Sequence, residues 1–238
     1  MSIKAVLFDL DGTLLPLNQY EFTNKYFKLL TDSLKDFGYN PDELTSAVWK
    51  GTSAMVNNDG SKSNKKAFWE IFSKYYPENT SDSEKYFTDF YNTDFQKARD
   101  FCGFNPKANI AVNTAKNMGY KTILATNPIF PALATESRIY WAGLNPSSFE
   151  FYTSYENMGF SKPNIKYYTE IANRIGLLPE ECLMVGNDVD EDMIAESIGM
   201  KVFLLTDCLV NTNNKDISLY ENGDFDKLIE YIKTMNNH

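Results

Sequence analysis

Five short apolar runs recur along the chain and have the length and composition of strands buried on both faces of a parallel sheet. The runs are Ile3 to Phe8, Lys121 to Ala125, Phe149 to Thr153, Cys182 to Val185 and Lys201 to Leu205. A segment with helical spacing follows each of the last four runs. These segments are Pro131 to Trp141, Pro163 to Ile175 with Pro163 at the first helical position, Asp190 to Ile198 closed by Gly199, and Phe225 to Ile232. Strands alternating with helices predict an α/β fold, a doubly wound, Rossmann-like parallel sheet with right-handed crossovers.

The first run is separated from the second by more than a hundred residues, and this insertion has a different pattern. Residues 17 to about 100 are rich in Phe, Tyr, Asn and Lys, with apolar positions at helical spacing. Examples are Phe22, Tyr26, Leu29 and Leu30, then Phe68, Ile71, Phe72 and Tyr75, then Phe87, Phe90 and Tyr91. These stripes predict the core of a helical bundle in preference to a stacking surface for a base or ring, with a polar loop at residues 57–66. We expect a Rossmann-like core formed by residues 1–16 and 105–238, and an inserted, smaller α-helical domain formed by residues 17–104.

The charge balance narrows the classes of partner. The 238 residues carry a formal net charge of −9, which gives the chain no general attraction for nucleic acid or for an anionic membrane. An acidic protein that handles an anionic substrate needs a local positive centre, such as a metal ion or a well-placed lysine. The length suits one large domain or two small ones, and the oligomeric state is expected to be a monomer or a homodimer.

The cysteine and histidine content limits the kinds of catalytic and metal site that the chain can form. The three cysteines, Cys102, Cys182 and Cys208, have no CxxC spacing and are interpreted as free thiols in a reducing compartment, with Cys182 in the core. The N-terminus lacks a signal-peptide pattern and no apolar run reaches membrane-spanning length, so we expect a cytoplasmic protein. Because the only histidine is His238, the last residue, catalysis by histidine and a His-ligated zinc are nearly excluded.

Polar side chains follow the first four apolar runs. In open α/β sheets, ligands bind beyond the carboxyl ends of the strands, so residues at these positions should meet at one edge of the sheet. They are Asp9, Asp11 and Thr13 after the first run, Thr126 and Asn127 after the second, Lys162 after the third, and Asp188, Asp190, Glu191 and Asp192 after the fourth.

The chemistry of this set indicates a bound cation and an anionic substrate. Two partly buried carboxylates two residues apart repel each other unless something positive lies nearby, as at Asp9 and Asp11. Mg²⁺ prefers oxygen ligands, which the carboxylates of Asp9 and Asp188 and a backbone carbonyl near Asp11 could supply. Lys162 can keep Asp9 ionised and bind a phosphoryl oxygen. Thr126, Asn127 and loop N–H groups can bind the other oxygens of a phosphate-shaped anion.

In this order and spacing, the residues resemble the motifs of the haloacid dehalogenase (HAD) superfamily. Most of its members are phosphatases with an aspartate nucleophile, and the similarity is to the phosphoglycolate phosphatase-like subgroup. The most specific signal is the sequence Asp9-Leu10-Asp11-Gly12-Thr13 after a strand, and the four motifs span residues 5 to 192. The resemblance implies that Asp9 forms an aspartyl-phosphate and that Asp11 protonates the leaving oxygen and then deprotonates the attacking water.

The resemblance also implies the remaining roles. Thr126 and Lys162 would hold the phosphoryl group, and Gly12, Thr13 and Asn127 are further phosphate-binding candidates. Mg²⁺ would be bound by Asp9, Asp11 and Asp188, with Asp192 as a second acidic partner. The fourth motif departs from the family pattern because it has Gly-Asn-Asp in place of Gly-Asp, so Asn187 could occupy the position assigned to Asp188.

The inserted domain matches the family's helical cap, which closes over the site and selects the substrate. Hinges are expected near residues 13–17 and 102–107. Lys62, in the polar loop, could meet a phosphorylated substrate or lie on a solvated surface. The sequence therefore predicts a Mg²⁺-dependent phosphatase that acts on a small phosphorylated metabolite. A phosphomutase of the same superfamily and a non-catalytic regulatory relic remain alternatives, whereas a dehalogenase is disfavoured because it needs neither the Asp11 acid nor the metal.

Overall fold

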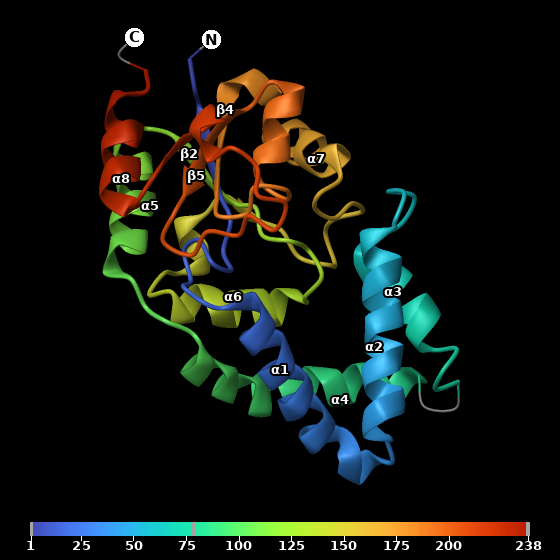
Figure 1. Ribbon diagram of the computed structural model, residues 1–238. Coiled ribbons are helices and arrows are strands. Elements are labelled where there is room, and N and C mark those ends of the chain that lie inside the picture. Colours follow the sequence, from blue (N-terminus) through green and yellow to red (C-terminus); the bar gives the residue numbers. More distant parts are fainter. Residues whose placement is uncertain (1, 78–79, 237–238) are drawn as a thin grey trace.

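Six parallel strands form a single sheet in the computed structural model, which describes residues 2–77 and 80–236 (Figure 1). The spatial order is β3-β2-β1-β4-β5-β6, so the first strand of the chain lies in the middle. The strands are β1 (Ala5–Phe8), β2 (Lys121–Leu124), β3 (Phe151–Tyr152), β4 (Cys182–Gly186), β5 (Lys201–Leu205) and β6 (Glu221–Gly223). This sheet, with helices on both faces, confirms the predicted α/β class.

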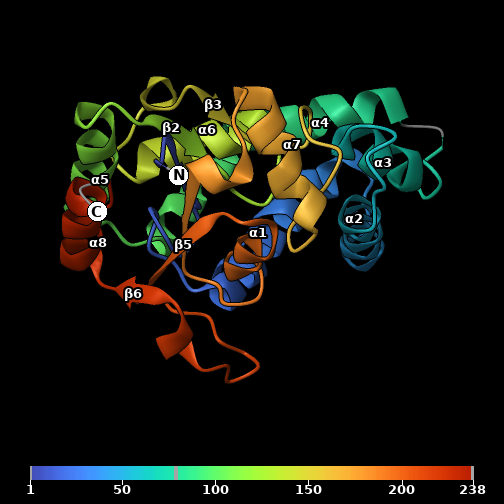
Figure 2. The same cartoon turned by 90° about the horizontal axis from the view of Figure 1, so that it is seen from above.

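Alternate residues of β1 pack into two separate layers of core. Val6 and Phe8 belong to the cluster that includes residues of α5 (Pro106–Asn117) and α8 (Phe225–Thr234). Ala5 and Leu7 belong to the cluster that includes residues of α7 (Ile165–Ile175). Figure 2 shows α5 and α8 together on one side of the strands and α7 on the other. Burial on both faces explains why β1 is continuously apolar in the sequence.

The inserted segment forms a group of helices beside the sheet (Figure 1). Its elements are α1 (Gln19–Leu34), a 3₁₀ turn (Lys35–Phe37), α2 (Pro41–Val56), α3 (Asn64–Phe72), α4 (Thr80–Asn92) and a 3₁₀ helix (Asp94–Phe101). Most of these apolar positions are buried. Leu29 and Ile71 are only partly buried, and Tyr75 lies beyond the end of α3, where it is exposed. The domain boundaries at residues 16/17 and 104/105 stay a prediction; both lie in segments without helix or strand.

The remaining helical elements follow the strands. They are α6 (Ala132–Trp141) and the 3₁₀ turns Pro146–Ser148, Pro179–Glu181, Met193–Ile198 and Ile217–Leu219. Two of the sequence predictions were wrong in detail. The helix expected at residues 190–198 is only the 3₁₀ turn from Met193, because the side chains of Asp188 and Asp192 hold the preceding backbone in a tight turn. In addition, α7 begins at Ile165 with Asn164 as its N-cap, so Pro163 precedes the helix.

Two further observations concern the cysteines and the length of the apolar helices. Cys182 is buried in the core as expected, and all three cysteines are free thiols. Within residues 2–77 and 80–236, no helix has the length and apolar character needed to cross a membrane.

Candidate active site

The carboxyl ends of β1, β2 and β4 open onto one cavity of about 300 Å³. Residues of α2, among them Trp49, Thr52 and Val56, also line this cavity. The structure brings nearly all of the site residues expected from the sequence to this cavity: Asp9, Asp11, Gly12, Thr126, Asn127, Lys162, Asn187, Asp188 and Asp192. Thr13 is buried next to the cavity and does not line it.

Asp9 is held by contacts to both of its carboxylate oxygens. The Lys162 ammonium donates to Asp9 Oδ1 at 2.8 Å, and the Thr13 hydroxyl lies 3.0 Å from Asp9 Oδ2. The Asp9 backbone N–H donates to the carbonyl of Val185, which extends the pairing of β1 with β4. The side chain is therefore fixed at the end of a central strand and faces the cavity.

Lys162 is buried between two carboxylates. Its Nζ atom is 2.6 Å from Asp192 Oδ1 as well as 2.8 Å from Asp9 Oδ1. Burial opposes the charge on Lys162, but the two carboxylates outweigh it and raise its pKa well above the usual range. A permanently charged ammonium beside Asp9 suits an anionic substrate.

Asp192 contacts Lys162 and the turn after β4. Its Oδ2 atom accepts the backbone N–H of Asp188 at 3.0 Å, so both of its oxygens are engaged within the protein. Burial raises the pKa of Asp192 to about 7, although the charge of Lys162 acts in the opposite direction. A Cβ at Gly186 would lie 2.1 Å from Asp192 Oδ2, so this approach requires glycine. These contacts support a role for Asp192 in positioning Lys162.

Asn187 and Asp188 have different surroundings. Asn187 Oδ1 accepts the Thr13 hydroxyl at 2.9 Å, and Asn187 Nδ2 donates to the carbonyl of Cys208 at 2.7 Å. Asp188 is half-buried, and its Oδ1 accepts the N–H groups of Asp190 and Glu191. No hydrogen bond reaches Asp188 Oδ2 from the part of the chain that the structure describes. The free oxygen supports Asp188, and not Asn187, as the residue available to a cation.

The donors at this cavity suit a hard cation that keeps several waters. Asp9 and Asp188 supply carboxylates at the cavity, and the backbone carbonyl of Asp11 is the third candidate ligand. The described residues contain no group of three or more His, Cys, Asp or Glu side chains placed to hold a metal ion. Two carboxylates with a carbonyl and waters fit Mg²⁺, which demands few protein ligands, better than a metal that needs a full cage of side chains.

Asp11 has a partner that sequence reasoning missed. The guanidinium of Arg138, from α6, is completely buried, forms an ion pair with Asp11 and lies 4.4 Å from the ring centroid of Phe130. Asp11 Oδ1 is buried and has no hydrogen-bond partner among the described residues. Burial raises the pKa of the Asp11 carboxyl even though Arg138 acts to lower it. Arg138 thus fixes one oxygen of Asp11 and leaves the other available.

A signal for Arg138 was present in the sequence. It shares one face of α6 with Ala134 and Thr135, which are also buried, so the helical pattern places it on the apolar face. An arginine on such a face requires a buried anionic partner. No sequence pattern identifies Asp11, which lies 127 residues earlier, as this partner.

Thr126 and Asn127 lie just after β2 and line the cavity. The Thr126 carbonyl accepts the hydroxyls of Thr153 at 2.6 Å and Tyr167 at 2.8 Å, which fixes the backbone there. Asn127 Nδ2 donates to Glu191 at 3.3 Å, while Asn127 Oδ1 is buried without a partner among the described residues. Lys62 lies elsewhere: it pairs with Glu70 at 2.6 Å and does not line this cavity.

Three curated proteins show sequence similarity to this chain. Two are named glyceraldehyde 3-phosphate phosphatase: one from Methanothermobacter thermautotrophicus is 30% identical over 49% of each chain, and one from Methanocaldococcus jannaschii is 25% identical over 98% of each chain. A phosphoglycolate phosphatase from Aquifex aeolicus is 25% identical over 96% of this chain and 97% of its own. The chain spans about half of the first relative and almost all of the other two.

Solved structures share the fold over nearly the whole length. A 2-haloacid dehalogenase from Pseudomonas syringae superposes with a TM-score of 0.66 and 18% identity, covering 98% of this chain and 99% of its own. A HAD hydrolase from Bacillus subtilis, reported bound to magnesium, superposes with a TM-score of 0.56 and 16% identity, covering 98% of this chain and 99% of its own.

A family model decides the assignment and confirms the resemblance inferred from the motifs. The model of the haloacid dehalogenase-like hydrolases matches residues 3–196 of the 238-residue chain, which includes every site residue discussed above. The protein therefore belongs to the haloacid dehalogenase-like hydrolase family.

Proposed function

We propose that the protein is a Mg²⁺-dependent phosphatase that hydrolyses a small phosphorylated metabolite through an aspartyl-phosphate on Asp9. The observation that carries this proposal is the placement of Asp9 between Lys162 and Thr13 in a cavity that Asp11 and Asp188 also line. The phosphatase names of the relatives support it.

The proposed reaction has two steps. A carboxylate oxygen of Asp9 attacks phosphorus, the bond to the leaving oxygen breaks, and Asp11 donates a proton to that oxygen. In the second step Asp11 takes a proton from water, and the resulting nucleophile attacks phosphorus to release inorganic phosphate and restore Asp9. Lys162 lies 2.8 Å from Asp9 and can neutralise charge on the phosphoryl oxygens in both steps.

A metal ion would be held at the same cavity. Asp9, Asp188 and the backbone carbonyl of Asp11 are the proposed ligands, and the magnesium reported for the Bacillus subtilis relative supports the choice of ion. When bound, Mg²⁺ supplies positive charge that lowers the repulsion between the substrate phosphate and the Asp9 carboxylate.

The Asp9→Asn variant tests the proposed nucleophile. Asparagine preserves the size of the side chain but cannot form the acyl phosphate, so kcat/KM for p-nitrophenyl phosphate should fall at least about 10³-fold. The assay is run with Mg²⁺ and with EDTA, and the wild type should turn over only with the metal. Release of inorganic phosphate, without transfer to an added sugar, separates hydrolysis from a mutase reaction.

A matched variant controls for general damage. Asp216 is exposed and caps a 3₁₀ turn away from the cavity, so Asp216→Asn should retain wild-type activity. Folding of both variants is checked by circular dichroism. Substantial activity in well-folded Asp9→Asn would refute the nucleophile assignment.

A further inference from the structure

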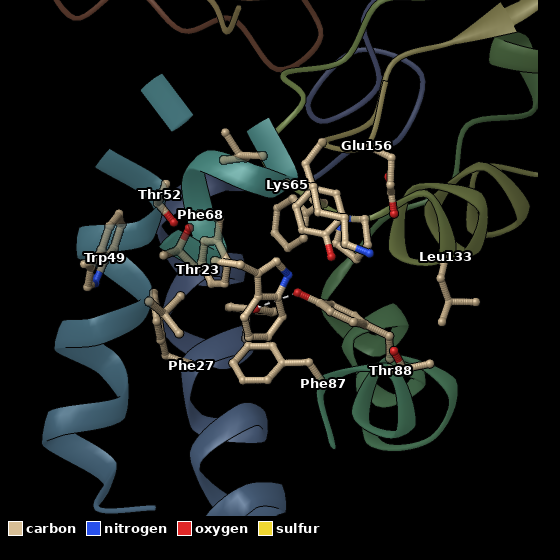
Figure 3. Close-up of a pocket in the computed structure, with 18 of the residues that line it drawn as sticks. Thr23, Phe27, Trp49, Thr52, Lys65, Phe68, Phe87, Thr88, Leu133 and Glu156 are labelled. Atoms are coloured by element: carbon tan, nitrogen blue, oxygen red, sulfur yellow. Dashed lines mark hydrogen bonds between the residues drawn. The ribbon is translucent and has the colours of Figure 1, made fainter. Parts of the chain in front are cut away.

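A second cavity of about 380 Å³ lies beside the first, and its lining is rich in aromatic side chains. Ten of its lining residues are Phe, Tyr or Trp. Figure 3 shows Phe27 of α1, Trp49 of α2, Phe68 of α3 and Phe87 of α4 around it. The aromatic cavity, as we call it, is therefore enclosed chiefly by the inserted helices, with α6 and the segment after β3 supplying Leu133 and Glu156.

The aromatic cavity and the cavity at Asp9 share part of their walls. The shared residues are Asp11, Gln19, Trp49, Thr52, Ile129 and Phe130. Asp9 and Lys162 line only the first cavity, whereas Asp11 lines both. If the phosphoryl group binds at Asp9 and the leaving oxygen at Asp11, the rest of the leaving group extends past Asp11 into the aromatic cavity.

The charges around the aromatic cavity disfavour a second anionic group on the substrate. Among the described residues that line it, Lys65 is the only cation, and it forms an ion pair with Glu84. Glu156, whose side chain accepts the backbone N–H of Ala132, places a second carboxyl group in the wall. An additional carboxylate or phosphate would meet acidic side chains and no free cation.

The size and lining indicate an uncharged ring. A dry apolar cavity of about 150 Å³ is enough to bind benzene, and the volume here is more than twice that. Aromatic walls bind rings through edge-to-face and offset contacts. We propose that the preferred substrate is a phosphate monoester of an uncharged alcohol that carries an aromatic ring. This inference rests on the proposed phosphatase function and specifies its leaving group.

The test compares kcat/KM for 2-phenylethyl phosphate, ethyl phosphate and 2-phosphoglycolate. The first two are primary alkyl esters with similar leaving-group chemistry, so their ratio reports the binding of the ring. We expect 2-phenylethyl phosphate to exceed both others by at least about tenfold. A preference for ethyl phosphate or 2-phosphoglycolate, or equal values, would overturn the inference.

Acetyl phosphate separates this inference from the proposed function. It is small and activated, so Asp9-dependent hydrolysis requires only the first cavity. If acetyl phosphate is hydrolysed and the ring gives no advantage, the phosphatase assignment stands and the inference fails. If no ester is hydrolysed, calorimetry decides: 2-phenylethyl phosphate should still bind the protein at least about tenfold more tightly than ethyl phosphate, and equal affinity would overturn the inference.

Two variants test where the aromatic ring of the substrate binds. Trp49 lines both cavities and its side chain is 50% exposed, so Trp49→Ala removes a wall without opening the core. The kcat/KM ratio of 2-phenylethyl phosphate to ethyl phosphate should fall at least about threefold. Tyr20 is 77% exposed on α1 and lines neither cavity, so Tyr20→Ala should leave the ratio unchanged. An unchanged ratio in Trp49→Ala would contradict the proposed position.

Discussion

At the scale of single residues, the ion pair between Arg138 and Asp11 has two effects. It balances a buried charge, which stabilises the fold, and it orients a carboxylate of the candidate active site. Arg138 is fully buried, and its Nε also donates to the carbonyl of Ala134 at 3.2 Å. A buried arginine is costly unless its charge is balanced, and Asp11 supplies the balancing charge. The same contact orients the carboxylate that is proposed to move the proton.

A double-mutant cycle tests this pair. Removing one partner of a buried ion pair leaves an uncompensated charge, so Arg138→Met should lower the free energy of unfolding by about 3 kcal/mol. In an Asp11→Asn background the same substitution leaves no unpaired carboxylate and should cost at least about 1 kcal/mol less. Urea unfolding of the four proteins measures both quantities.

A surface arginine provides the comparison for this cycle. Arg99 is exposed on the 3₁₀ helix Asp94–Phe101, so Arg99→Met should change stability by no more than about 0.5 kcal/mol. Equal costs of Arg138→Met in the wild-type and Asp11→Asn backgrounds would show that the pair does not couple.

At the scale of elements, the turn after β1 depends on close contact with the segment after β4. Gly12 has a φ of +84°, and a Cβ there would lie 2.4 Å from Asn187 Nδ2. Asn187 in turn accepts the Thr13 hydroxyl, which also contacts Asp9. A displacement at Gly12 therefore reaches the proposed nucleophile through two side chains.

A pair of glycine variants separates backbone strain from this contact. Gly176, at the C-terminus of α7, also has a positive φ of +70° but has no atom within 4 Å of its would-be Cβ. Gly176→Ala should cost about 1 kcal/mol of stability, from backbone strain alone, with kcat/KM unchanged. Gly12→Ala should cost more and lower kcat/KM at least about tenfold, because Asn187 and Thr13 must move. If the two variants behave alike in thermal unfolding and in turnover, the contact between Gly12 and Asn187 contributes nothing to activity.

Burial on both faces decided which elements could be predicted from the sequence. β1 and β4 are continuous apolar runs, and β5 is apolar after Lys201, because helices cover both sides of them. β6 (Glu221–Gly223) at the edge has little apolar character and was missed. α5 was also missed, because its buried face consists mainly of alanines and gives a weak pattern.

The site was predictable to the extent that it lies at strand ends. Asp9, Asp11, Thr126 and Asp188 follow strands, so topology alone brings them to one cavity. Arg138 lies in the interior of α6, and its pairing with Asp11 depends on how the tertiary fold places that helix relative to β1. The aromatic residues of the insertion were interpreted as core in preference to a stacking surface for a ring. Many are buried, but several of them also line a cavity, and periodicity cannot distinguish the two roles.

Across the molecule, the inserted helices also contact the sheet domain at residues far from 13–17 and 102–107, the two segments where the chain passes between them. Asn64, the first residue of α3, is completely buried, and its Nδ2 donates to the Pro128 carbonyl at 3.1 Å and to Ser161 Oγ at 3.0 Å. The Asn64 and Lys65 backbone N–H groups donate to the carbonyls of Met158 and Tyr155. Any opening between the two groups of elements about residues 13–17 and 102–107 must break these bonds.

Asn64→Ala tests whether this contact holds the two groups of elements together. It leaves the Pro128 carbonyl and the Ser161 hydroxyl without their buried donor, which should lower the free energy of unfolding by about 2 kcal/mol. Hydrogen exchange should become faster at the start of α3 and around residues 155–161, while α5, α8 and the central strands keep their protection. Asn57 is exposed, and its side chain bonds to Ser53 alone among the described residues, so Asn57→Ala should change stability by no more than about 0.5 kcal/mol and leave the exchange pattern as it is. Uniformly faster exchange across the sheet in Asn64→Ala would mean that the contact contributes to global stability. It would then not be a local bond whose loss affects only the joint between the two groups of elements.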